Sequence, residues 1–235
     1  MLVHIVFAHP SHDSFTGALL DAFTDGLDDA GHEHTVSDLY QMGFSPILDI
    51  DSYRREAAYA ADLPVPGDVA AEQAKLDAAD VWVFVYPVWW TDCPAILKGW
   101  FDRVWSVGYA YEPGHTDAGR GQRELALAAE AKEGVDERSE EHTHPERALP
   151  GVAASMDTAR WALVLCAAGH TEAELRESGC LQAMETVMLT DRISTRAEHK
   201  QFIVFGGSAV LKAETWQQQR VEHLAAARAL GRGLH

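Results

Sequence analysis

The stretch that decides the fold covers residues 80–111 and reads DVWVFVYPVWWTDCPAILKGWFDRVWSVGYAY. Its first part, residues 81–86, is an unbroken apolar run rich in valine, which is typical of a central strand buried on both faces. Pro87 ends the strand because proline donates no backbone hydrogen bond. After a short loop, residues 95–105 place apolar side chains at helical spacing. This order of strand, loop and helix indicates an open α/β sheet, in which ligands bind beyond the carboxyl ends of the strands.

Four further strands and four further helices are predicted around this stretch. The first helix has two candidate capping residues, Asp13 and Ser14, and a stop signal, Gly31. Because a helix follows each strand, the connections should be right-handed crossovers, which predicts a five-stranded parallel sheet with helices on both faces in a single domain, residues 1–235. The expected strands are 2–8, 34–38, 160–167 and 201–205, and the expected helices are 14–30, 67–79, 172–189 (broken at Ser178 and Gly179) and 214–230.

Two segments fall outside this alternation. Residues 39–66 form a long connection, which is typical of a functional or interface loop, and a helical turn is expected at 52–61. Residues 119–158 are polar, charged and poor in aliphatic side chains, so they are predicted to form an acidic surface insertion. This segment holds His142 and His144, but two histidines on a solvated loop do not predict a metal site without further ligands.

The chain is strongly acidic, with 36 acidic residues, 19 basic residues and a net charge of −17. No basic stripe interrupts this charge, so binding to nucleic acid is not expected. Only five of the basic residues are lysines, a composition that suits a salt-rich cytoplasm, although solubility alone explains it as well. Full activity at low salt would contradict the salt-adapted interpretation.

The sequence also indicates the cellular compartment in which the protein is expected. No apolar run has the length of a membrane span, and the N-terminus reads as a first strand rather than as a signal peptide. The three cysteines, Cys93, Cys166 and Cys180, are odd in number and widely spaced, which gives neither a disulfide framework nor a paired metal motif. We therefore expect a cytoplasmic protein without membrane insertion.

Three loops should meet at the carboxyl edge of the sheet, namely residues 8–18, 87–93 and 167–171. The first precedes a helix, and the hydroxyls of Ser14 and Thr16 with the free amides of the helix start can hold a phosphate. A simple helix cap explains the same residues. No G-x-G-x-x-G motif is present, which argues against a dinucleotide-binding fold.

The second loop carries Trp89 and Trp90 directly after the buried strand. Such a pair covers a flat ligand, closes the top of the core or contacts another protein, because aromatic side chains dominate all three kinds of surface. The residue types alone leave these alternatives open.

Three segments resemble, in the correct order, the flavodoxin-like NAD(P)H:quinone oxidoreductases. They are AHPSHDSFTGALLDAF (8–23), SDLYQMGFSPIL (37–48) and PVWWTDCPAILKGWFDRVW (87–105). The resemblance implies a flavodoxin-like fold, FAD as cofactor with FMN as the alternative, and NADH or NADPH as electron donor. It also implies two-electron, ping-pong reduction of quinones or related aromatic compounds by a homodimer whose pockets take residues from both subunits.

The resemblance also implies which residues bind the flavin. They are His9, Ser14, Phe15, Thr16 and Ala18 on the phosphate and adenosine side, Pro87, Val88, Trp89, Trp90 and Thr91 along the isoalloxazine ring, and Ala167, Ala168 and Gly169 on the pyrimidine side.

The predicted catalytic residues are Tyr109, Tyr111 and His170. The two tyrosines match aromatic positions that roof the substrate pocket of the family, and Tyr111 is the better match. Well-known members follow the third loop with a Tyr and a His that assist hydride transfer, whereas these positions fall near Glu174 and Cys180 here. His170 is the nearest imidazole; it either donates to a flavin or quinone oxygen or serves only the helix that follows.

Two other functions remain open. A flavodoxin-fold regulatory subunit that senses redox state or nucleotide for a partner, such as an ion-efflux system, would not need the missing Tyr and His. An FMN electron carrier of the flavodoxin type is a weaker alternative, because such carriers are much shorter and have a phosphate loop rich in Ser and Thr.

Overall fold

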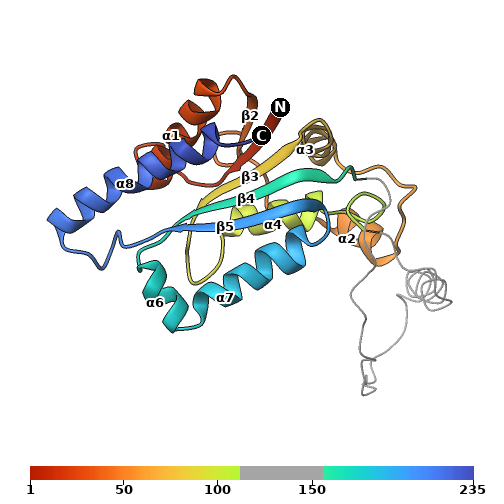
Figure 1. Ribbon diagram of the computed structural model, residues 1–235. Coiled ribbons are helices and arrows are strands. Elements are labelled where there is room, and N and C mark those ends of the chain that lie inside the picture. The colour runs from red at the N-terminus through yellow and green to blue at the C-terminus, as the bar shows by residue number, and fades with distance from the viewer. Residues whose placement is uncertain (112–155) are drawn as a thin grey trace, which may run out of the picture.

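The computed structural model describes residues 1–111 and 156–235. Within them, the predicted parallel sheet is confirmed: five strands lie in the order β2-β1-β3-β4-β5, and every neighbouring pair is parallel (Figure 1). The most buried strand, β3, is the valine-rich run of the central stretch, and it lies between β1 and β4. The strands are β1 (Leu2–Phe7), β2 (Glu33–Asp38), β3 (Val81–Pro87), β4 (Ala159–Ala167) and β5 (Ala197–Phe205).

One face of the sheet is covered by α1 (Phe15–Asp29) and α8 (Ala213–Arg232), which lie side by side (Figure 1). Alternate residues of the strands, such as Ile5 and Val83, point into this layer and pack with Phe23 of α1. This alternation is the period of two that a strand imposes on its side chains.

The opposite face is covered by α3 (Gly67–Asp77), α4 (Ala95–Val104) and α7 (Cys180–Glu185). Trp82 and Trp100 are fully buried in this layer. A short helix, α6 (Glu172–Glu177), precedes α7, and α2 (Ile50–Ala57) lies in the long connection after β2, close to the predicted turn.

The layer under α3 contains buried polar groups. Nδ1 of His4 lies 2.8 Å from the hydroxyl of Thr35, and its Nε2 is buried with no hydrogen-bond partner among the described residues. Burial lowers the pKa of His4 to about 4. The neighbouring Glu72 is fully buried and accepts hydrogen bonds from the indole of Trp100 at 2.9 Å and from the amine of Lys75 at 2.5 Å. The hydroxyl of Ser37 also donates to this carboxylate at 2.9 Å, so a cation and two neutral donors compensate its burial.

Two predicted boundaries differ from the structure. The helix expected at 172–189 is interrupted at Ser178 and Gly179 as predicted, but after α7 it continues as a π-helix, η1 (Thr186–Ile193). Strand β5 begins earlier than predicted, because its first half lies at the exposed edge of the sheet and carries polar side chains that hide the strand pattern.

Some predicted features fall on residues that the structure does not describe. The predicted acidic insertion, 119–158, lies outside the described residues except for its last three positions, and His142 and His144 lie outside them as well. Among the helices that the structure describes, none combines the length and the apolar character needed to cross a bilayer. The same part of the chain holds no group of three or more His, Cys, Asp or Glu side chains arranged for a metal ion.

Candidate functional site

Backbone hydrogen bonds bring the three predicted loops together at the carboxyl edge of the sheet. The amide of Val88 donates to the carbonyl of Ala167 at 2.8 Å, which joins the second loop to the third. The amide of Ala8 donates to the carbonyl of Val85 at 3.0 Å, and the rings of His9 and Trp89 lie 6.2 Å apart, which joins the first loop to the second. The predicted convergence is therefore present within one chain.

A fourth loop, residues 206–212, also contributes to this edge. The amide of Gly207 donates to the carbonyl of Ala168 at 3.1 Å, and the amide of Ala209 donates to the carbonyl of Gly169 at 3.0 Å. This loop was not among the three that were predicted to form the site. The glycine pair directly after the last strand was the signal that could have indicated it, because Gly207 has a φ of 104° that favours glycine.

The first loop folds closely over the start of α1. The hydroxyl of Ser14 accepts a hydrogen bond from the amide of Gly17 at 3.0 Å, so Ser14 is the N-cap of the helix. A Cβ at Gly17 would lie 2.2 Å from the carbonyl oxygen of His12, so only glycine allows this close approach. The Thr16 side chain is buried, which leaves Ser14 as the more accessible hydroxyl of the predicted pair.

Histidines hold the rest of this loop. Nε2 of His12 lies 2.6 Å from a carboxylate oxygen of Asp38 at the end of β2, and Nδ1 of His9 accepts a hydrogen bond from the amide of Ser11 at 3.0 Å. Phe15 packs edge to face on Trp216 of α8, with ring centroids 4.9 Å apart. The helix start, an exposed imidazole and a capping hydroxyl thus form a surface that suits an anionic group.

The second loop is a tight turn. The amide of Trp89 donates to the carbonyl of Asp92 at 2.9 Å, and the amide of Asp92 donates back at 3.1 Å. Between them, Trp90 has a φ of 50° and Thr91 a φ of 61°, a left-handed conformation that costs roughly 1–2 kcal/mol for each such residue. Trp89 is 42% exposed and Trp90 is fully exposed, so the alternative that they close the top of the core is wrong.

The turn is anchored by Asp92. Its carboxylate accepts a hydrogen bond from the amide of Cys93 at 2.7 Å and forms a two-pronged ion pair with Arg192 of η1, with N–O distances of 2.9 and 3.1 Å. Burial of Asp92 opposes ionisation, but the hydrogen bonds from Arg192 and Cys93 hold the pKa of its carboxyl below the usual range. The carboxylate therefore stays charged at neutral pH.

The third loop leads into α6. Thr171 caps this helix, and its hydroxyl and amide pair reciprocally with Glu174. These hydrogen bonds hold the pKa of Glu174 below its usual value. His170 is exposed at the carboxyl edge, and its Nδ1 lies 3.7 Å from Glu174. Because Thr171 is the helix cap, the imidazole of His170 is not needed for capping.

A thiol also lies beside the second loop. The hydroxyl of Thr91 lies 3.8 Å from the sulfur of Cys180, the first residue of α7. Hydrogen bonds from Ser178 and Thr91 lower the pKa of this partly exposed thiol. Cys180 was not among the residues predicted to form the site.

The two predicted catalytic tyrosines lie at the opposite edge of the sheet. Helix α4 runs back from the carboxyl edge, so the residues after it reach the amino ends of the strands. The hydroxyl of Tyr109 donates to Asp77 at 2.8 Å, at the end of α3, and the hydroxyl of Tyr111 donates to Glu56 at 2.7 Å. The two tyrosines therefore lie away from the loops of their own chain, and their expected role in roofing a substrate pocket stays a prediction that needs the loops of a second subunit.

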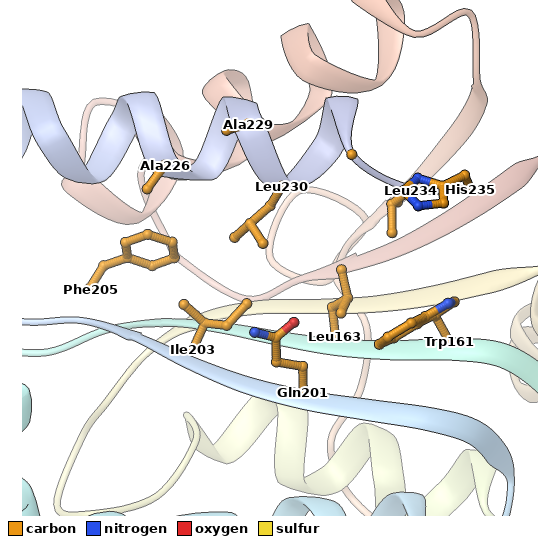
Figure 2. A pocket seen from close by; sticks show the side chains of 11 residues that line it. Trp161, Leu163, Gln201, Ile203, Phe205, Ala226, Ala229, Leu230, Leu234 and His235 are labelled. Carbon is orange, nitrogen blue, oxygen red and sulfur yellow. The ribbon is translucent and has the colours of Figure 1, made fainter.

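A wide apolar pocket lies away from this edge. It has a volume of about 680 Å³ and lies between α8 and the surface of β4 and β5. Figure 2 shows Leu230 and Ala226 above it and Ile203, Leu163 and Trp161 below it. Its walls carry few polar groups, so it lacks the chemistry that is present at the carboxyl edge.

Residues 1–147 match the family described as having the flavodoxin-like fold. The chain belongs to this flavodoxin-like family. The predicted flavodoxin-like fold is thereby confirmed.

Named relatives of this flavodoxin-like chain are quinone reductases. The chain is 38% identical over 120 residues to NAD(P)H dehydrogenase [quinone] 1 of Rattus norvegicus, which covers 46% of this chain and 44% of the rat protein. It is 37% identical over 149 residues to ribosyldihydronicotinamide dehydrogenase [quinone] of Pongo abelii, covering 57% and 64%. These matches span about half the length of the curated relatives.

A solved structure matches the whole chain. The NAD(P)H:quinone oxidoreductase from Methanothermobacter marburgensis has a TM-score of 0.75 and 36% sequence identity, and the match covers 100% of this flavodoxin-like chain and 97% of the other.

Proposed function

We propose that this protein is a flavin-dependent NAD(P)H:quinone oxidoreductase. The observation that carries the proposal is the meeting of the loops at the carboxyl edge, where a capped helix start and two exposed tryptophans lie side by side. The full-length likeness to a quinone oxidoreductase supports the same conclusion.

The groups at this edge fit a flavin. Ser14, His9 and the start of α1 offer hydrogen-bond donors and a positive helix terminus to a phosphate. The left-handed turn presents aromatic surface at Trp89 and Trp90 to a planar ring, together with its backbone. When bound, the flavin accepts a hydride from NADH or NADPH and passes two electrons to an acceptor.

In this proposal the residues of the chain position and shield the flavin and orient the donor and the acceptor. The turn would hold one side of the flavin ring, and the third loop with Ala167, Ala168 and Gly169 would hold another, so that donor and acceptor could stack closely on the cofactor. His170 is exposed at the same edge and can donate a proton to a reduced oxygen of the acceptor. The donor leaves before the acceptor enters, because both need the same open face, which gives ping-pong kinetics.

We propose quinones or related aromatic compounds as acceptors and FAD as the cofactor, with FMN as the alternative. The two flavins share the ring and one phosphate, so either could bind to the first two loops. Identification of the flavin released by heat, by chromatography against standards of both, distinguishes them.

We also propose that the protein is a homodimer of a single-domain chain. Tyr109 and Tyr111 can roof a pocket only if the amino edge of a second copy meets the loops of the first. The long connection after β2 exposes large apolar side chains that such an interface would cover. They are Met42, Ile47, Ile50, Tyr53 and Leu63. Light scattering that gives the mass of one chain at working concentration would contradict the dimer.

The three cysteines are unpaired thiols. This supports our proposal of a reducing cytoplasm as the compartment.

A second candidate is a redox- or nucleotide-sensing subunit of a partner protein. The observation that favours it is the third loop, where Glu174 is engaged with Thr171 and no tyrosine follows. Such a subunit would bind flavin but turn over slowly.

The test is a flavin spectrum taken without oxygen. Addition of NADH or NADPH should bleach the flavin absorbance within the mixing time, and a quinone should restore it. Slow bleaching with full flavin occupancy would favour the sensing subunit, and failure to bind FMN or FAD after reconstitution would overturn the proposed function.

A further inference from the structure

The turn between Trp89 and Asp92 is the strained part of the candidate site. Trp90 and Thr91, its two central residues, both have positive φ values of 50° and 61°. Glycine and asparagine usually occupy such positions, because their side chains tolerate the left-handed region, whereas a β-branched threonine does not favour it. An isolated segment with this sequence would relax to another conformation, so other parts of the structure must hold the turn.

Asp92 connects the turn to the rest of the molecule. One carboxylate oxygen accepts the amide of Cys93 at 2.7 Å and the Nη1 of Arg192 at 2.9 Å, and the other accepts Nη2 of Arg192 at 3.1 Å. The carboxylate is thus fixed in direction by a planar guanidinium, which a single-point cation could not do.

Arg192 is itself held in place. Its side chain is only 7% exposed, its Nη1 lies 3.2 Å from the sulfur of Met188 and 3.3 Å from that of Cys93, and its guanidinium lies 5.3 Å from the centre of the Phe101 ring. Its backbone carbonyl accepts the indole N–H of Trp105 at 2.5 Å. Arg192 lies on the π-helix η1, an unusual turn that often occurs at functional sites.

We propose that Arg192 is a positioning residue for the flavin: by its two-pronged pair with Asp92, it holds Trp90 and Thr91 in the conformation in which the turn meets the ring. This inference rests on the proposed function and adds to it. Asp92 and Arg192 are 100 residues apart in the sequence. The conformation of the loop after β3 therefore depends on the segment that precedes β5.

The structure offers a matched control. Arg103 of α4 forms a two-pronged pair with Asp68 of α3, with N–O distances of 2.6 and 3.0 Å. The side chains are 5% and 43% exposed, compared with 7% and 45% for Arg192 and Asp92. The two pairs are alike in geometry and burial, but Arg103 is near the end of α4 and away from the loops.

The experiment compares Arg192→Lys, Asp92→Asn and the double variant with Arg103→Lys. Flavin dissociation constants are measured by quenching of flavin fluorescence for FMN and FAD, together with the visible circular dichroism of the bound flavin, below the melting temperature of every variant. Because relaxation of the turn lowers the population that can bind, we expect each change at the Asp92 pair to weaken flavin binding by about tenfold to thirtyfold and to alter the dichroism.

The double variant should bind flavin no more weakly than either single variant, because the two single substitutions remove the same interaction. Arg103→Lys should lower the melting temperature to a similar extent and leave the dissociation constant and the dichroism unchanged.

Each outcome decides a different point. If the wild-type chain binds neither flavin, the proposed function and this inference both fall. If the wild-type chain binds flavin and the Asp92 and Arg192 variants bind it equally well with an unchanged spectrum, only the inference falls. If Arg103→Lys weakens binding as much as Arg192→Lys, the effect is general destabilisation and the inference is also overturned.

Discussion

Gly26 of α1 and Gly231 of α8 bring the backbones of the two helices into direct contact. A Cβ at Gly26 would lie 2.1 Å from the carbonyl oxygen of Arg228, and one at Gly231 would lie 2.3 Å from that of Phe23. Both clashes involve backbone atoms, so a side chain cannot be accommodated by a rotamer change, and the helices would have to separate.

Gly231→Ala should therefore destabilise the protein. We expect the free energy of unfolding to fall by about 1–3 kcal/mol, the usual effect of overpacking, as measured by denaturant titration. Gly67→Ala is the matched control, because a Cβ there meets nothing within 4 Å. Equal stability of Gly231→Ala and the wild type would show that the contact between α1 and α8 adapts.

Trp90→Ala should separate stability from cofactor binding. The side chain is fully exposed, so the free energy of unfolding should change by less than about 0.5 kcal/mol. Flavin binding should weaken by about twofold to twelvefold, since an aromatic contact is worth roughly 0.5–1.5 kcal/mol. Trp90→Phe keeps a flat ring and should restore most of the affinity, which fluorescence titration of the three proteins would measure. Unchanged affinity in Trp90→Ala would leave the interface role as the explanation for this side chain.

Stability should depend on pH through His4. Burial lowers its pKa to about 4 in the folded chain, below the ordinary value of 6.5, so the unfolded chain binds the proton first as the pH falls. Stability is therefore full above pH 6.5 and should decrease between pH 6.5 and 4, by about 3 kcal/mol in total for a shift of this size.

The check for His4 is a series of urea titrations at several pH values down to 4.5. His4→Phe removes the titrating group and should flatten the pH dependence in this window. A slope that persists in His4→Phe would assign the effect to other groups.

Cys180 should be the thiol that reacts first. It is partly exposed with a lowered pKa, whereas burial raises the pKa of Cys93 to about 12 and also raises that of Cys166. The thiolate is the reactive form, so an aromatic disulfide reagent should modify one thiol rapidly in the native protein. The rapid phase should disappear in Cys180→Ser and slow down when flavin covers Thr91. A rapid phase that survives the substitution would contradict this assignment.

The fold was largely predictable because it depends on local patterns. The valine-rich run before Pro87, the cap at Ser14 and the alternation of strands and helices each indicate their element from neighbouring residues. The start of β5 was not predictable in this way, because an edge strand in contact with water needs no apolar pattern. The π-helical continuation after α7 depends on packing against other segments and has no simple local signal.

Only the loops that directly follow the strands could be predicted as parts of the site. The loops at 8–18, 87–93 and 167–171 follow parallel strands, so topology brings them together. The pairing of Asp92 with Arg192 joins residues far apart in sequence, and no motif marks it. The position of Tyr109 and Tyr111 depends on the direction of α4, which carries the chain back to the amino edge.

This separation of aromatic groups between the two edges has a genetic consequence. In the proposed homodimer, a two-fold axis places the loops of each chain against the tyrosines of the other. A chain altered at Trp90 and a chain altered at Tyr111, each defective alone, would form a hybrid in which one pocket receives two intact contributions and the other receives two altered ones. Two inactive alleles could thus complement each other through shared assembly.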